Sequence, residues 1–457
     1  KLKYHASIHQ HEGNRFVAVV GAPEVLLGLS EKVWREGKSF DLSTEEKQKL
    51  ESIFLSMSRE GLRVVALAET NTVPEILTHD VIKSLTFVGF FGMKDALRPE
   101  VSEAMRKATS ADIRVVMITG DHKVTAQAIA KEAGIFKEGD TILTGQDIDA
   151  YSDEELSEKL SETSVFARVT PEHKLRIIKA YRARGEIIAM TGDGVNDAPS
   201  LVAADLGIAM GKIGTEVAKE ASDIVLLDDN FGSIVSAVEE GRSIYKTIKK
   251  VLLYLFAGSL SQVLTIIGSV FLGIPLPLLA AQIIWLNFVT DGFLDVSLAM
   301  EPKEEGLLNG NFERPKKYLI DKLMLKRMAL MAIPLAIGTL VLFNLYYAID
   351  MVKAWTVVLT TLAVGHWLNA WNCRHESKSI FQINPFSNKF LAGTTLVIVF
   401  LHLLAVYNPL MQKFLHTAPL ELSEWFLIIP IASSVVLVEE IRKFFYRRSL
   451  HIKYAAN

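Results

Sequence analysis

The sequence has one cysteine in 457 residues, so cysteine cross-links contribute little to its fold. Cys373 alone excludes an intrachain disulfide framework and a zinc site built from several cysteines. Basic residues are not in excess, because 49 Lys and Arg stand against 52 Asp and Glu. This balance argues against nucleic acid as a partner. The first residues lack an initiator Met and an apolar signal core, and we expect the chain to begin inside a longer protein.

Charge is scarce in the second part of the chain. Asp, Glu, Lys and Arg make up 71 of the first 250 residues but only 30 of the last 207. The apolar stretch between Lys250 and Asp291 is long enough for two membrane spans joined at Gly273–Pro277. Four more charge-poor stretches lie at 328–349, 354–373, 390–412 and 425–438. We therefore expect a globular part followed by six helices in a lipid bilayer.

The basic residues around these spans favour one side of the membrane. Eighteen Lys and Arg lie on one set of loops, whereas the opposite loops carry only Lys353 and Lys413. Positive charge marks the cytoplasmic side. We expect a multi-pass integral membrane protein whose globular part is cytoplasmic, in the plasma membrane if the source is bacterial.

Polar side chains inside membrane spans are costly, and they commonly serve function. In the second span Asn287, Asp291 and Asp295 recur at every fourth position, so a regular helix would place them on one face, bordered by Thr290. Their oxygens are the ligands that a hard cation such as Ca²⁺ accepts. Other spans contribute Ser259, Gln262, His366, Asn369 and Asn372.

Two interpretations of the polar side chains in the spans remain open: a functional role, or hydrogen bonding between helices. Hydrogen bonding between helices accounts well for Ser259, Asn369 and Asn372. It accounts poorly for Asp291, because an unpaired carboxylate in hydrocarbon is expensive. His366 could be a cation ligand, a proton carrier or a packed neutral ring.

From about residue 85 to Leu227, short apolar runs alternate with helical patterns, which is typical of a parallel α/β sheet. The helix Pro171–Arg184 is marked by Thr170 as its N-cap and by Gly185 just past its end. The strand-like runs are Leu85–Phe91, Ile113–Ile118, Ser164–Arg168, Glu186–Met190, Leu206–Met210 and Asp223–Leu227. Ligands of such sheets bind at the carboxyl ends of the strands.

Two of those strand ends carry candidate chemistry. The first is followed by Thr119-Gly-Asp121, and the second by Thr191-Gly-Asp-Gly-Val-Asn-Asp197. Two carboxylates four residues apart can hold one Mg²⁺. Lys174, on the helix that lies between these strands in the sequence, could bring an ammonium to a phosphoryl oxygen. Thr119 could hydrogen-bond a second phosphoryl oxygen.

The string Met190-Thr-Gly-Asp-Gly-Val-Asn-Asp-Ala-Pro-Ser200 resembles the hinge motif of P-type ATPases, pumps that move cations on a phospho-aspartate cycle. The block Asn287-Phe-Val-Thr-Asp-Gly292 resembles the type II, calcium-pump-like branch. The remaining matching blocks, in the family's order, are Gly21-Ala-Pro-Glu24, Met117-Ile-Thr-Gly-Asp121, Val165-Phe-Ala-Arg-Val-Thr-Pro-Glu-His-Lys174 and Asp228-Asp-Asn-Phe231. The resemblance covers essentially the whole chain, but only the C-terminal half of such a pump.

The resemblance implies three parts and two cofactors, ATP and Mg²⁺. Residues 1–80 would belong to a nucleotide-binding domain, 81–235 to a HAD-like (Rossmann-like) α/β phosphorylation domain, and 236–457 to a stalk and six transmembrane helices. Asp193 would hold Mg²⁺ with support from Asp197. Further implied site residues are Thr119, Gly120, Asp121, Lys174 and Asn196 for catalysis, and Gly21, Arg63, Arg168 and Asn196 for the nucleotide. Asp95 and Arg98 match a hinge block whose two prolines are replaced here.

Departures from the family pattern are equally informative. The Asp-Lys-Thr-Gly-Thr motif with the phosphorylated Asp is missing, and Val20 replaces a family Lys beside the nucleotide. Family positions with Asn, Glu and Glu in the membrane read Ser259, Gln262 and His366. Asn287, Thr290 and Asp291 are retained and Asp295 is additional, so we expect one cation per cycle, with His366 and Asp295 exchanging protons.

The sequence therefore predicts the C-terminal half of an ATP-driven cation pump, with Ca²⁺ favoured, that is inactive without its N-terminal half. A helix of about forty residues from Phe231 to Gly273 would couple its two parts. The alternatives are a pump for a monovalent cation or a proton, an inactive split-pump fragment, and a membrane-anchored HAD phosphohydrolase with Asp95 as nucleophile.

Overall fold

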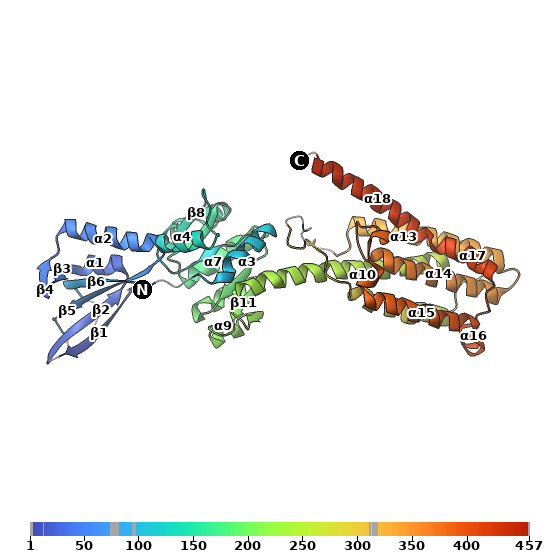
Figure 1. Cartoon of the computed structure of the whole chain (residues 1–457), viewed down its shortest axis with the longest axis horizontal. Coiled ribbons are helices and arrows are strands. Elements are labelled where there is room, and N and C mark those ends of the chain that lie inside the picture. The colour runs from blue at the N-terminus through green and yellow to red at the C-terminus, as the bar shows by residue number, and fades with distance from the viewer. Residues whose placement is uncertain are drawn as a thin grey trace. The chain divides into compact units, whose positions relative to one another are not determined.

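The computed structural model describes residues 3–11, 13–73, 82–93, 97–309, 312 and 319–455. They form two compact units, one of Lys1–Ala237 with Leu308–Asn311 and one of Val238–Leu307 with Phe312–Asn457. The first unit is α/β and the second is helical (Figure 1). The expected fold class is confirmed.

The first unit begins with a six-stranded sheet of order β1-β2-β5-β6-β3-β4, antiparallel except where β3 pairs with β6. Alternating burial of Val17 and Val19 on β2 places them in a core with Leu26 and Phe87. The elements are β1 (Tyr4–His11), β2 (Asn14–Gly21), α1 (Pro23–Leu29), β3 (Ser30–Arg35), β4 (Lys38–Asp41), α2 (Thr44–Arg59), β5 (Arg63–Thr70) and β6 (Leu85–Met93).

The parallel strands of the first unit form two small sheets, of order β7-β9-β8 and β10-β11-β12. The assignment of Leu85–Phe91 to the same sheet as these strands was wrong, because β6 pairs with β5 and β3. The strands are β7 (Met117–Ile118), β8 (Thr141–Thr144), β9 (Thr163–Ala167), β10 (Ala189–Gly192), β11 (Leu206–Met210) and β12 (Ile224–Leu226). The helical segments around them are α3 (Pro99–Ser110), α4 (Lys123–Glu132), α5 (Gly145–Ala150), α6 (Asp153–Lys159), α7 (Pro171–Ala183), η2 (Val195–Asp197), α8 (Ala198–Ala203) and α9 (Glu216–Glu220).

Local signals set the ends of α7 as predicted. Thr170 Oγ1 accepts a hydrogen bond from His173 N, Pro171 occupies the first turn, and Gly185 lies just beyond the helix at φ +77°. These caps fix where α7 starts, and with it the position of Lys174 in the first turn.

The second unit contains five described helices that are long and apolar enough to cross a membrane. They are α10 (Phe231–Phe271, which begins in the first unit), α13 (Lys322–Tyr346), α14 (Met351–Cys373), α15 (Lys389–Tyr407) and the pair α17 (Leu422–Ala432) and α18 (Ser434–Ala455). The second expected span is one continuous helical stretch that changes type along its length, from α11 (Ala280–Ile284) through the π-helical η3 (Trp285–Asp291) to α12 (Gly292–Ala299). Short elements η4 (Ile380–Gln382), η5 (Pro385–Ser387) and α16 (Pro409–Leu415) join the others.

The helices of the second unit pack around α14 (Figure 1). Seventeen of the 23 residues of α14 are buried, among them the polar residues His366, Asn369 and Asn372. Asn372 Nδ2 donates to the carbonyl of Val435 on α18 at 3.1 Å, which is the helix-to-helix bond expected of it. The neighbours α13, α17 and α18, together with η3, α12 and α15, thus surround a helix that carries polar groups.

Candidate functional site

The turn after β7 holds Thr119, Gly120 and Asp121. Thr119 N extends the β7–β9 pairing by donating to Phe166 O at 2.9 Å. The Thr119 hydroxyl donates to Asp121 Oδ2 at 3.2 Å and accepts from Asp121 N at 3.1 Å. Gly120 is exposed, and a Cβ there would meet nothing within 4 Å. The turn is therefore closed by its own side chains and leaves an open surface above Gly120.

The turn after β10 holds the second predicted group. Asp197 is buried, its Oδ1 lies 2.5 Å from Lys174 Nζ, and its Oδ2 accepts from Gly194 N at 3.2 Å. Asp193 and Asn196 are exposed at the surface of the same turn. Asp197 thus positions the Lys174 ammonium, and Asp193 keeps a carboxylate accessible to a ligand.

Glycine is required at one position of this turn. A Cβ on Gly192 would lie 2.6 Å from the Asp197 Cβ, which is closer than side-chain carbons approach. A side chain at residue 192 would therefore displace Asp197, the partner of Lys174.

Two arginines reach the turn after β7 from other elements. Arg63 Nε on β5 lies 3.6 Å from Asp121 Oδ1. Arg168, at φ +54°, donates its backbone N–H to Asp121 O at 3.0 Å and pairs through Nη2 with Glu24 Oε1 at 2.6 Å. Glu24 and the neighbouring His122 were not among the predicted site residues, although Glu24 lies in the Gly21-Ala-Pro-Glu24 block. Burial, together with the charge of Arg168, lowers the pKa of His122.

Gly21, predicted to lie at the nucleotide, has a close neighbour within its own sheet. A Cβ there would approach the Cβ of Tyr4 to 2.5 Å, since Gly21 pairs with Tyr4 across β1 and β2. Strand packing therefore already demands glycine at this position. Asp95 lies outside the described residues, and Arg98 Nη1 donates to the carbonyl of Asp229.

The described residues include no group of three or more His, Cys, Asp or Glu side chains that could hold a metal ion. Mg²⁺ binds proteins through one or two carboxylates and takes its other ligands from water and phosphate. Asp193 beside the Lys174-bound Asp197 fits such a Mg²⁺, shared with a phosphoryl group. The two carboxylates alone would not make a closed metal site.

The predicted membrane carboxylate points into the helix bundle. Asp291 at the end of η3 is 4 % exposed, and its Oδ1 accepts from Tyr254 Oη on α10 at 2.7 Å. His366 Nδ1 on α14 lies 2.8 Å from the same oxygen. One carboxylate oxygen therefore joins three helical segments that are distant in sequence.

His366 reaches Asp291 by packing against the backbone of α10. A Cβ on Gly258 would lie 3.1 Å from His366 Cε1, and Ser261 Oγ lies 3.5 Å from His366 Nε2. Tyr254, Gly258 and Ser261 were not predicted to belong to the site. A signal exists for Tyr254 and Gly258, because they recur with Gln262 at every fourth position of one helix, but none exists for Ser261.

The expectation that Asn287, Asp291 and Asp295 stack on one regular helix face was wrong, because η3 is a π-helix. The hydrogen bonds of η3 join residues five apart, so Asn287 no longer aligns with Asp291, whereas Asp295 follows Asp291 on the regular helix α12. Asn287 is exposed on the bundle and accepts from Gln262 Nε2 at 3.3 Å, whereas Asp291 faces inward. Ser259 is exposed as well.

Two further oxygens of this region are buried and have no hydrogen-bond partner among the described residues. They are Thr290 Oγ1, on a residue with no exposed surface, and Asp295 Oδ1. Buried polar atoms normally have partners. Unpaired oxygens next to Asp291 are therefore available to a cation or to water.

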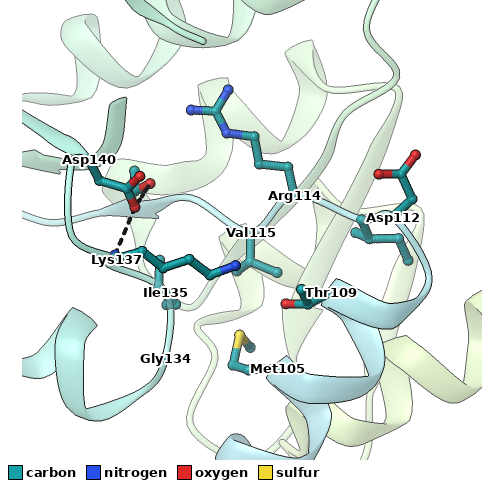
Figure 2. A pocket seen from close by; sticks show the side chains of 11 residues that line it. Met105, Thr109, Asp112, Arg114, Val115, Gly134, Ile135, Lys137 and Asp140 are labelled. Carbon is teal, nitrogen blue, oxygen red and sulfur yellow. Dashed lines mark hydrogen bonds between the residues drawn. The ribbon is translucent and has the colours of Figure 1, made fainter. Parts of the chain in front are cut away.

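A separate cavity of about 240 Å³ lies elsewhere in the first unit and contains none of the predicted site residues. Figure 2 shows Lys137 and Thr109 on its walls, and Asp140, which accepts from Lys137 N at 2.8 Å. Chemistry at the two turns therefore does not involve this cavity.

Comparison with known proteins finds a family match in both parts of the chain. Residues 26–205 match the family model described as haloacid dehalogenase-like hydrolase, and residues 275–445 match the model described as cation transporting ATPase, C-terminus. The chain is 36 % identical over 433 residues to a calcium-transporting ATPase of Bacillus subtilis, covering 93 % of this chain and 48 % of that protein. It is 37 % identical over 447 residues to calcium-transporting ATPase 1 of Saccharomyces cerevisiae, covering 94 % and 46 %.

A vertebrate calcium-transporting ATPase matches this chain to a similar extent. The chain is 34 % identical over 425 residues to calcium-transporting ATPase type 2C member 1 of Bos taurus, covering 93 % of this chain and 44 % of that protein. The chain thus spans about half the length of the curated relatives that it matches. Together with the apolar helices, these similarities establish an integral membrane protein.

Proposed function

Because the chain belongs to the P-type cation-transporting ATPases, we propose that it supplies the C-terminal half of an ATP-driven pump for Ca²⁺ or a similar cation. The observation that carries the proposal is the buried Asp291, held by Tyr254 and His366 within an apolar bundle. A helix bundle that only anchors a phosphohydrolase has no need of such a carboxylate. The printed names of the relatives favour Ca²⁺ as the transported ion.

The two turns of the first unit support a role in phosphoryl transfer. The Lys174 ammonium, fixed by Asp197, would donate to a phosphoryl oxygen, and Thr119 and Gly120 would offer hydrogen bonds at the neighbouring turn. Asp193 would hold Mg²⁺, which offsets phosphoryl charge when bound. Arg63 and Arg168, next to Asp121, would contact the phosphates of ATP, and Asn196 would lie near them.

The sheet edges suggest where the other half of the pump binds. The strands that precede the two turns, β7 and β10, are edge strands of their described sheets, and Ile187 beside β10 is 84 % exposed. Edge strands with exposed apolar side chains readily pair with a further strand. We expect the N-terminal half to add a strand there that carries the phosphorylated Asp.

The surface of the second unit supports the same partner. Ser259 exposes a polar side chain on α10, which is long and apolar enough to cross a membrane, and Asn287 on η3 is exposed as well. A polar group facing acyl chains is costly unless another helix covers it. Covering helices of the N-terminal half would complete a single cation site with Asn287, Thr290 and Asp291, and with Gln262, Asp295 and His366 nearby.

Coupling between the two parts would use α10, which runs unbroken for 41 residues and carries Tyr254 and Gly258. At about 1.5 Å per residue, such a helix is about 60 Å long. A displacement of its cytoplasmic end would move the donors that hold Asp291 and His366. The excess of basic residues on one set of loops supports a cytoplasmic location of the first unit.

Coexpression with an N-terminal half that carries Asp-Lys-Thr-Gly tests this function. Uptake of ⁴⁵Ca²⁺ into vesicles should need both halves and ATP, and Asp291→Asn should abolish it while leaving assembly of the halves intact. Two Ca²⁺ per ATP would refute the single site, and phosphatase activity of this chain alone would favour the anchored hydrolase.

A further inference from the structure

The loop between α14 and α15, with the start of α15, exposes several phenylalanine side chains. It joins two candidate membrane spans, so residues 374–388 lie at a membrane surface. Phe381 on η4 is 86 % exposed and Phe386 on η5 is 71 % exposed. Phe390, the second residue of α15, is also exposed. Three phenyl rings within ten residues are thus left uncovered by the chain.

The inner side of this loop is firmly held. Arg374 pairs with Glu301 at 2.9 Å and donates to Asn384 O at 3.2 Å and Ser387 Oγ at 2.6 Å. Ile380 N donates to Glu440 Oε1 on α18 at 2.9 Å. Bonds on both sides of η4 and η5 fix the backbone. The exposure of Phe381 and Phe386 is therefore a property of the folded loop.

Two exposed ammonium groups lie close in sequence to the rings. Lys378 precedes η4 and Lys389 begins α15. Neither forms an ion pair with a carboxylate in the described part of the chain. Glu440, the acidic residue that contacts the loop backbone, is also within 3.5 Å of Lys443, so its charge is already offset. The outer face of the loop is aromatic and positively charged.

We propose that this face, made of Lys378, Phe381, Phe386, Lys389 and Phe390, binds anionic phospholipids of the adjoining leaflet. The phenyl rings would enter the acyl region, and the two ammonium groups would contact headgroup phosphates. A lipid fits better than a protein partner, because the face lies between the ends of two spans, at the depth where the bilayer itself supplies apolar and anionic contacts. The inference does not depend on transport activity.

A fluorescent label on the loop tests the proposal with the full chain in nanodiscs. Phe381→Cys can be labelled with bimane, because the native Cys373 is 1 % exposed and the unsubstituted chain measures any reaction there. The quenchers are phosphatidylglycerol and phosphatidylcholine, each with a nitroxide at the same acyl carbon. Phe426→Cys on α17 is the matched control, since Phe426 is 76 % exposed and the described part of α17 has no basic residue.

We expect the label at residue 381 to be quenched at least twofold more by phosphatidylglycerol than by phosphatidylcholine, and the label at 426 equally by both. Lys378→Gln with Lys389→Gln should bring the ratio at 381 to about one, and Lys378→Arg with Lys389→Arg should keep it. Equal quenching by both lipids in the parent, or a ratio unchanged by the glutamines, would overturn the headgroup contact. No quenching by either lipid would show that the rings face water or another protein, and would overturn the proposal entirely.

Discussion

His366 Nδ1 lies 2.8 Å from Asp291 Oδ1, and this pair joins α14 to the end of the π-helical η3. Their side chains are 1 % and 5 % exposed, so neither is solvated by water. Breaking a buried pair by removing one partner leaves an uncompensated polar group. The pair therefore contributes to the stability of the bundle as well as to the proposed cation site.

Replacing His366 alone should destabilise the second unit. We expect His366→Leu to lower the free energy of unfolding by about 3 kcal/mol, because it leaves Asp291 with Tyr254 as its remaining partner. Adding Asp291→Asn to the His366→Leu variant should lower the free energy of unfolding much less than Asp291→Asn lowers it in the parent protein. Thermal unfolding in detergent, arranged as a double-mutant cycle, measures this coupling, and additive effects would contradict the pair.

Gly258 gives a finer test of the same packing. In most helices Gly→Ala stabilises by about 1 kcal/mol. At Gly258 the new methyl group would press on His366 at 3.1 Å, so we expect Gly258→Ala to gain nothing or to destabilise. Gly241→Ala on the same helix is the control, because a Cβ there meets nothing within 4 Å. Equal gains at both positions would show that His366 is not held against α10.

In the first unit, the effects of Gly→Ala on stability can be compared at Gly192 and Gly120. Gly192→Ala places a methyl group 2.6 Å from the Asp197 Cβ and should destabilise by about 1–3 kcal/mol through overpacking. Gly120→Ala meets open space and should stay within about 0.5 kcal/mol of the parent. Urea unfolding of the full chain, followed by intrinsic fluorescence, compares them. A similar loss at both glycines would contradict the close approach to Asp197.

How far the sequence predicts this structure depends on the range of the interactions. Thr170 and Gly185 act locally, and α7 begins and ends where they indicate. The pairing of β6 depends on β5 and β3, which no local pattern reveals. Apolar composition predicted the long spans, but periodicity assumes regular helices and so misses the π-helix at Asp291. The four-residue spacing of Tyr254 and Gln262 places them on one helix face, but it does not show that Asp291 is the partner of Tyr254.

Two residues outside the spans, His375 and Glu304, should contribute to the pH dependence of stability. His375 Nδ1 accepts from Ser377 N at 3.1 Å and from Lys378 N at 3.0 Å, which requires an unprotonated Nδ1. Burial lowers the pKa of His375 to about 4, from an ordinary value of 6.5. Burial raises the pKa of Glu304, but its ion pairs with Lys250 and Lys246 outweigh this and lower it to about 2.

Both shifts make acid destabilising, but in different windows. Between pH 6.5 and 4 the unfolded chain binds a proton at residue 375 that the folded chain does not, so stability falls as pH falls through this range. Glu304 is ionised in the folded state, and its contribution is present above pH 4.5 and lost towards pH 2. His375→Gln should therefore flatten the stability curve between pH 6.5 and 4. Glu304→Gln should flatten it only below about pH 4.5.

Unfolding midpoints measured at half-unit steps from pH 7.5 to 3.5 separate these two contributions. His416 serves as the control, because it lies in a different loop and its left-handed backbone at φ +51° can be kept by His416→Asn. That variant should retain the parent's slope between pH 6.5 and 4. If His375→Gln kept the same slope as well, the acid sensitivity would arise elsewhere, and the hydrogen bonds to His375 Nδ1 would not hold the ring neutral.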